Sequence, residues 1–220
     1  MSKNWWKVLA SVLIIYSIIG GLLIDVPALP ILNETIRIVY FHVPMWFSML
    51  LLYLISVIYS IKYLSSGNTN HDLIAVESVN TGVIFCLLGL ISGMLWANIT
   101  WGDPWPNDPK LNGSAIATLM YLAYLVLRNS LDEEQKRAKI SAVYNIFAFP
   151  VMIVLLFILP RLTDSLHPGN GGNPGFSNLD LDSKMKMVIR PAFAGWMLMG
   201  VWIMTLRYRI RKIENIQNTN

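Results

Sequence analysis

The chain has 220 residues, of which 14% are charged and 55% apolar, with a formal net charge of +4 and a pI near 9.2. Soluble globular domains carry about 25% charged residues, and disordered chains combine low hydrophobicity with high net charge, so both classes are excluded. The basic residues form no dense tract of the kind that binds phosphate backbones. We therefore expect an all-α polytopic integral membrane protein whose charged partner is the lipid bilayer and not nucleic acid.

Apolar stretches long enough to cross about 30 Å of hydrocarbon occur six times, within what we expect to be a single membrane domain of residues 1–220. The first of them has the apolar core of a signal peptide, but no small-x-small cleavage site follows it, so we interpret it as a retained anchor. Pro150 lies in the fifth and predicts a kink. Cys86 lies in the third and is expected to be a buried structural thiol. The predicted spans are residues 6–24, 43–64, 80–97, 113–127, 140–159 and 187–206.

The distribution of lysine and arginine predicts the orientation, because basic loops tend to stay in the cytoplasm. With the N-terminus inside, eleven of the 17 basic residues fall in cytoplasmic segments and six in outer ones. We therefore expect both termini in the cytoplasm. In this arrangement His42 and His167 share the outer surface, whereas His71 lies in an inner loop.

Two neutral imidazoles on one face can ligate a metal ion or the iron of a haem from opposite sides. The alternative is that each histidine is an interfacial residue that bonds to backbone or water, and the residues alone leave both interpretations open. Zinc held by the protein alone is less favoured. A structural zinc takes four protein ligands and a catalytic one three, and no cysteine or further histidine lies outside.

The outer loop at residues 98–112 combines tryptophans with three prolines. Tryptophans normally form a belt at the membrane interface, which accounts for one or two of them. The prolines stiffen the backbone, so Trp101 and Trp105 are expected to form a rigid aromatic shelf that suits a flat apolar ring system. We expect Asp103 and Asp108 to orient indole N–H groups or a neighbouring lysine, and not to touch the ligand.

Four segments spread over most of the chain carry a resemblance to a known family. They are Arg-Ile-Val-Tyr-Phe-His-Val-Pro at residues 37–44, Trp-Gly-x-x-Trp-x-x-Asp-Pro-Lys at 101–110, Arg-Ala-Lys-Ile-Ser-Ala-Val at 137–143, and Leu-His at 166–167. Together they resemble the CcmC family, the tryptophan-rich haem-handling subunits of cytochrome c maturation. Members usually read Trp-x-Trp-Asp at the end of the loop, whereas Pro106 and Asn107 precede Asp108 here, so one aromatic ring is missing.

The resemblance implies a non-covalently held b-type haem on the periplasmic side of a bacterial inner membrane, with its iron ligated by His42 and His167. It also implies delivery of haem to the chaperone CcmE, beside the ABC transporter subunits CcmA and CcmB. A haem site needs axial donors, a flat apolar surface and cations for the propionates. The expected haem-binding residues are His42, His167, Trp101, Trp105, Asp108, Arg37 and Lys110, with Trp46 as a further ring contact and Arg161 and Arg190 as further propionate partners.

No nucleophile, general base or phosphate-binding loop accompanies these residues, so we expect a protein that holds and releases haem and not an enzyme. The alternative function is a non-haem permease or scaffold subunit of a membrane complex, with structural histidines. The glycine-rich segment at residues 169–178 either passes haem or forms a surface loop, and composition leaves both open. Whether haem is moved across the bilayer or only received outside is equally open.

Overall fold

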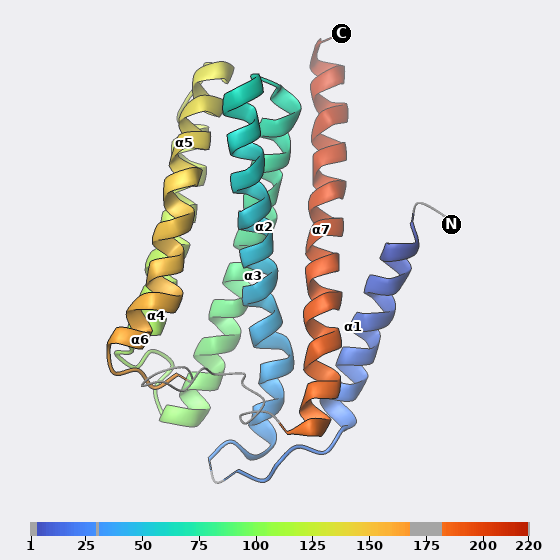
Figure 1. Cartoon of the computed structure of the whole chain (residues 1–220), viewed down its shortest axis with the longest axis vertical. Helices are drawn as coiled ribbons and strands as arrows, with labels where there is room; N and C mark the ends of the chain where they lie inside the picture. The colour runs from blue at the N-terminus through green and yellow to red at the C-terminus, as the bar shows by residue number, and fades with distance from the viewer. Residues whose placement is uncertain (1–3, 30, 168–181, 220) are drawn as a thin grey trace.

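The computed structural model of the chain describes residues 4–29, 31–167 and 182–219, so the glycine-rich segment lies outside the described residues. In this part of the chain, six helical segments are long and apolar enough to cross a membrane, which confirms the all-α, six-span prediction. Figure 1 shows them running side by side. The helices are α1 (Trp5–Leu23), α2 (Val39–Ser66), α3 (Thr69–Trp101), α4 (Pro109–Asn129), α5 (Glu134–Ile153), α6 (Leu159–Leu162) and α7 (Ser183–Thr219), with a 3₁₀ turn η1 (Asn33–Ile38) and a π-helical turn η2 (Val154–Ile158).

Several helices extend past the spans expected from hydropathy. Helix α3 runs over residues 69–101 where residues 80–97 were expected, because hydropathy detects only the apolar middle of a helix and not its polar ends. The Asn68 side chain caps its start, and Gly102 ends it with a φ of 78°, a conformation that glycine adopts without strain. The tryptophan-rich connection is therefore shorter than residues 98–112, and Trp101 belongs to a helix.

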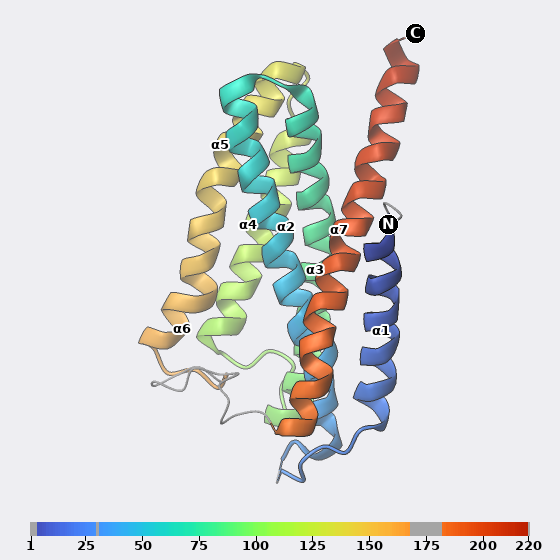
Figure 2. The same cartoon turned by 45° about the vertical axis from the view of Figure 1, so that its right-hand side comes forward.

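The helices form a bundle in which α2, α3, α4 and α5 pack together. Helix α7 packs against α2 and α3, and α1 packs against α7. Figures 1 and 2 agree on this arrangement. The start of α1 and the end of α7 are directed toward the same end of the bundle. Residues 24–29, 31–38, 102–108 and 163–167 lie at the other end, which we call the tryptophan-loop end.

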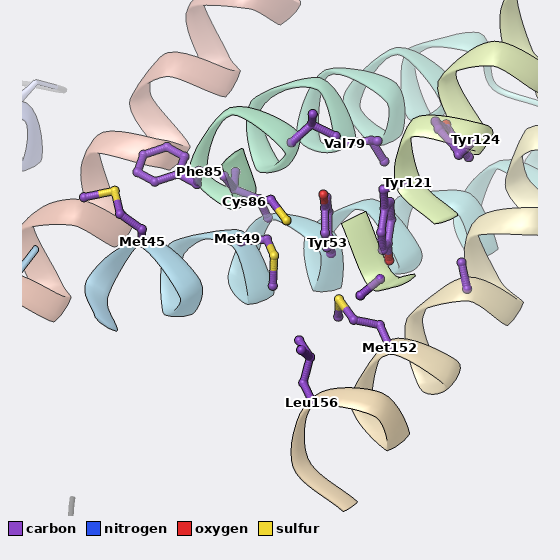
Figure 3. Packing of buried hydrophobic residues seen from close by; sticks show 14 of the residues in the cluster. Met45, Met49, Tyr53, Val79, Phe85, Cys86, Tyr121, Tyr124, Met152 and Leu156 are labelled. Atoms are coloured by element: carbon purple, nitrogen blue, oxygen red, sulfur yellow. The ribbon is translucent and has the colours of Figure 1, made fainter. Parts of the chain in front are cut away.

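The core contains a stacked pair of tyrosine rings between α2 and α4. The rings of Tyr53 and Tyr121 lie parallel with centroids 3.5 Å apart, and Met49 and Met152 pack around them (Figure 3). Gly82 of α3 lies against the Tyr53 ring, where a Cβ atom would be only 2.4 Å from a ring carbon. Close approach at small residues is how membrane helices gain packing contacts, since lipid offers no hydrophobic driving force between them.

Cys86 is buried in this core, as expected, with its Sγ 3.0 Å from the Thr118 hydroxyl. Pro150 lies inside α5, and the backbone passes into the π-helical turn η2 at Val154. A proline offers no N–H to the preceding turn, so the helix is locally weakened there.

Ion pairs link neighbouring helices in the part of the bundle that is distant from the tryptophan-loop end. Arg128 of α4 and Asp72 of α3 form a buried bidentate ion pair, with Nη1 donating to Oδ1 over 2.8 Å. Arg207 of α7 donates to the buried Glu77 of α3 over 2.8 Å. Charges within a membrane protein are costly unless paired, so these contacts fix which helix faces pack together.

Candidate functional site

His167 follows α6 and is held by a carboxylate from the tryptophan-rich loop. Its Nδ1 lies 3.0 Å from Oδ1 of Asp108, and the aspartate side chain is completely buried while that of His167 is 21% exposed. The Trp101 ring meets the imidazole edge-on at 5.0 Å between centroids. This arrangement fixes the ring and leaves Nε2 as the imidazole atom available to a ligand, as in carboxylate–histidine–metal sites.

The same Asp108 carboxylate organises the chain on both sides of the site. Oδ1 accepts from the backbone N–H groups of Lys110 and Leu111 and so caps α4, a role favoured by the Pro109 that follows at the first helical position. Oδ2 accepts from the Ser165 hydroxyl and the Leu166 N–H. One carboxylate thus joins the start of α4 to the segment after α6.

The hydrogen bonds set the protonation of this aspartate. Burial by itself raises the pKa of Asp108, but the hydrogen bonds from His167, Ser165 and the Leu166 N–H lower it more strongly, so the pKa lies well below its usual range. Asp108 is therefore an anion at neutral pH. It accepts a hydrogen bond from the Nδ1–H group of His167. Sequence reasoning expected it to orient indoles or a lysine; it orients the histidine instead.

His42 lies in the first turn of α2 and packs against α3. Its Nδ1 lies 3.1 Å from the Ser92 hydroxyl, so Nε2 is again the remaining ring nitrogen. A Cβ on Gly93 would approach the imidazole Cε1 to 2.8 Å, which shows how closely the helix backbone meets the ring. Trp46 and Trp96 contact the ring edge-on at 6.3 and 5.9 Å between centroids.

Sequence reasoning missed the contribution of α3 to this side of the site. Trp96 Nε1 and Thr100 Oγ1 are buried without a hydrogen-bond partner among the described residues. In the same part of the chain, the hydroxyls of Tyr53 and Tyr121 in the core are also without a partner, so these two atoms do not by themselves indicate a bound group. The signal that could have found this surface is Gly89-x-x-x-Gly93, a spacing that marks close approach between membrane helices.

The loop between α3 and α4 is held by its own polar groups. Asp103 accepts from the Trp105 N–H over 2.8 Å, and the Trp105 indole donates to Asn112 over 3.2 Å. Asn112 in turn donates to Asn107, which stands where family members usually carry a tryptophan. The expected rigid loop therefore has a physical basis, with a polar link in place of the missing ring.

Lys110 and Arg37, two of the expected propionate partners, have different surroundings. Lys110 lies at the start of α4, where the charges of Asp108 and Arg161 act on it. Arg37 has a structural role, because its Nη1 donates to the carbonyls of Gly21 and Ile24 at the end of α1 and its Nε to Glu34. Propionate binding by Arg37 stays a prediction.

Arg190, also expected to bind a haem propionate, lines a hollow between α1 and α7. His42 in the first turn of α2 and His167 after α6, by contrast, both lie toward the tryptophan-loop end. The structure thus brings the two histidines into one region and gives Arg190 different neighbours.

The donor set suits haem better than a bare metal ion. In the described part of the chain, no group of three or more His, Cys, Asp or Glu side chains is placed to hold a metal. Haem brings four equatorial nitrogens of its own and needs only axial donors from the protein. Two histidines with engaged Nδ1 atoms, beside edge-on tryptophans, fit that requirement.

Six membrane-length helices with a carboxylate-oriented histidine at one end define a multi-pass membrane protein with a candidate ligand site beside its tryptophan-rich loop. Residues 1–219 match the family model described as CcmC, Heme exporter protein C, and the chain belongs to that family. Membership supports a role in haem handling for cytochrome c maturation in a bacterial membrane.

Curated relatives have similar names. The chain is 24% identical to Heme exporter protein C of Rhodobacter capsulatus over 217 residues, covering 94% of this chain and 86% of the relative. It is 24% identical to Heme exporter protein C of Bradyrhizobium diazoefficiens over 188 residues, covering 84% and 71%. Cytochrome c biogenesis protein CcsA of a Synechococcus strain is 33% identical over 89 residues, 40% of this chain and 29% of that protein.

Proposed function

We propose that His42 and His167 bind the two axial positions of a non-covalently held b-type haem through their Nε2 atoms. The observation that carries this proposal is the pair of engaged Nδ1 atoms, on Ser92 for His42 and on the Asp108 carboxylate for His167. An anionic partner at Nδ1 fixes the tautomer and raises the basicity of the other ring nitrogen. His167 is then the better donor of the two, and His42 the weaker one.

The surrounding residues supply the other parts of a haem site. Trp101, Trp105 and Trp46 are proposed ring contacts, and Lys110, Arg161 and Arg37 are proposed propionate partners. Arginine and lysine suit carboxylates because they donate charge-assisted hydrogen bonds. Asp108 acts through His167 as a positioning residue.

Unequal axial ligands suit a protein that must release its ligand. We propose that the haem is passed on to a membrane-tethered chaperone of the CcmE type, with CcmA and CcmB as the accompanying ABC transporter subunits. The tryptophan-loop end would then lie on the periplasmic side, with both termini in the cytoplasm. The excess of basic residues at the opposite end supports this orientation.

The ligand proposal is tested by measuring haem per protein in the purified full-length chain by the pyridine haemochrome method. We expect His42→Ala and His167→Ala each to lower the ratio to below about a tenth, the size of loss found when a metal ligand's support is removed. His71→Ala is the matched control, since His71 bonds to Ser66 at the opposite end of the bundle. If both site variants retained haem like the control, the scaffold function would be favoured.

The orientation is tested separately with single cysteines in a Cys86→Ser background. Asp103 is exposed at the tryptophan-loop end and Asp132 is exposed in the connection at the opposite end. We expect a membrane-impermeant maleimide to label Asp103→Cys in intact spheroplasts, and Asp132→Cys only after lysis. The reverse pattern would place the site in the cytoplasm.

A further inference from the structure

A second candidate site lies between α1 and α7, away from the histidines. These two helices run antiparallel and side by side in both views (Figures 1 and 2). A hollow of about 540 Å³ opens between them, a volume within the range of ligand sites. It is lined by Tyr16, Ser183, Lys186, Met187, Arg190 and Pro191.

Placing the bilayer surface at the tryptophan-loop end of α7 puts the hollow at the depth where the lipid headgroups meet the acyl chains. Ser183 begins α7 at the tryptophan-loop end, and Arg190 lies seven residues further, about 10 Å along the helix at 1.5 Å per residue. Tyr16 lies the same number of residues before Leu23, where α1 ends beside it. The polar mouth is therefore near the bilayer surface, and Arg190 lies deeper.

Arg190 is an exposed basic residue of α7. Among the described residues it makes no ion pair, although a guanidinium inside the bilayer is costly unless it is paired or reaches the interface. Lys186, one turn away at i−4, adds a second positive charge to the lining. Lys184, which does not line the hollow, forms an ion pair with Asp25 over 2.8 Å.

The lining also contains a hydrogen-bond acceptor that the helix does not use. Pro191 has no N–H, so the carbonyl of Met187 four residues earlier receives no helical hydrogen bond. Both residues line the hollow, together with the hydroxyls of Tyr16 and Ser183. The lining thus combines basic and hydroxyl-bearing residues. Asp182, which precedes α7, is not part of the lining.

We propose that this hollow binds the headgroup of an anionic phospholipid, with Arg190 on the phosphate. The net negative charge of phosphatidylglycerol then favours it over the zwitterionic phosphatidylcholine. The acyl chains run along α1, which exposes Val12, Ile15 and Ile19. The lipid thus fills the hollow between α1 and α7, the helix against which α1 packs.

The test is native mass spectrometry of the purified full-length protein, titrated in detergent with phosphatidylglycerol or phosphatidylcholine of matched chains. We expect the parent to retain phosphatidylglycerol preferentially. Arg190→Gln should lower its apparent affinity about fivefold, the effect of one basic residue at an anionic headgroup. Arg190→Lys, which keeps the charge, should lose less.

Lys184→Gln is the matched control, because it removes the same charge from a residue of α7 that does not line the hollow. We expect it to bind phosphatidylglycerol like the parent. Equal binding by the parent and Arg190→Gln, or equal loss in Lys184→Gln, would overturn the proposal. A fall in haem per protein in Arg190→Gln with unchanged lipid binding would also overturn it and assign Arg190 to a haem propionate.

Discussion

Asp108 and His167 lie 59 positions apart in the sequence, yet the carboxylate Oδ1 and the imidazole Nδ1 are 3.0 Å from each other. The same aspartate caps α4 and binds the segment after α6. The tryptophan-rich loop is therefore more than an aromatic surface: through its last acidic residue it sets the position of a histidine that comes from a different part of the chain.

Asp108→Asn should lower haem retention without unfolding the protein. Asparagine still caps a helix, so α4 is expected to begin at the same place. The amide carries no charge, so His167 loses its anionic partner, and haem affinity should fall by roughly 10- to 100-fold, as for other partners that orient metal ligands. The measurement is haem titration of the purified apoprotein, followed by absorbance.

Asp103→Asn is the control for that experiment. Asp103 is an exposed acidic residue in the same loop, and it accepts from the Trp105 N–H without contacting a histidine. We expect haem affinity close to that of the parent. Equal losses in the two variants would mean that loop charge, and not the orientation of His167, controls haem binding.

Stability should depend on Asp108 only in a defined pH range. Its pKa is depressed in the folded protein and about 3.9 in the unfolded chain, so its stabilising contribution is fully present above about pH 4. That contribution is lost as the pH falls through the folded pKa. The difference in melting temperature between the parent and Asp108→Asn should be constant from pH 7 to 5 and shrink toward pH 3. A difference that grows on acidification would contradict the assigned shift.

Gly93→Ala should disturb haem binding through His42. The added Cβ would lie 2.8 Å from the imidazole Cε1, so the ring must rotate away from its present position. We expect haem per protein to fall severalfold while the amount of protein in the membrane stays near that of the parent. The ratio is measured by the pyridine haemochrome method.

The control is Gly82→Ala on the same helix. There the new Cβ would meet the Tyr53 ring at 2.4 Å, in the core and away from the histidines. A general packing defect should lower the amount of protein and leave haem per protein unchanged. If Gly82→Ala lost haem as Gly93→Ala did, the effect would be one of packing and not of His42 position.

Asp72→Asn should destabilise the bundle strongly. It leaves the buried Arg128 without its carboxylate, and breaking a buried pair in this way costs about 3–5 kcal/mol. Thermal unfolding in detergent should show a clearly lower melting temperature. Asp25→Asn removes a carboxylate from an exposed pair with Lys184 and should change the melting temperature little. Similar shifts in both variants would contradict the account.

The helices were predictable because their apolar middles are long, but their ends were not. Trp101 was expected in a loop and lies in α3, since the cap at Gly102 and not hydropathy decides where that helix ends. The pairing of Asp108 with His167 was not predictable from spacing, because it depends on how α4 and α6 come together. Only the Asp-Pro start of α4 signalled a cap.

The most direct test of the central claim is electron paramagnetic resonance of the haem-loaded ferric protein. Two axial imidazoles predict a low-spin signal in the parent, conversion to high spin in His42→Gly and in His167→Gly, and recovery of the low-spin signal when free imidazole is added to each. A low-spin spectrum that is unchanged in either variant before imidazole is added would show that the histidine removed does not ligate the iron.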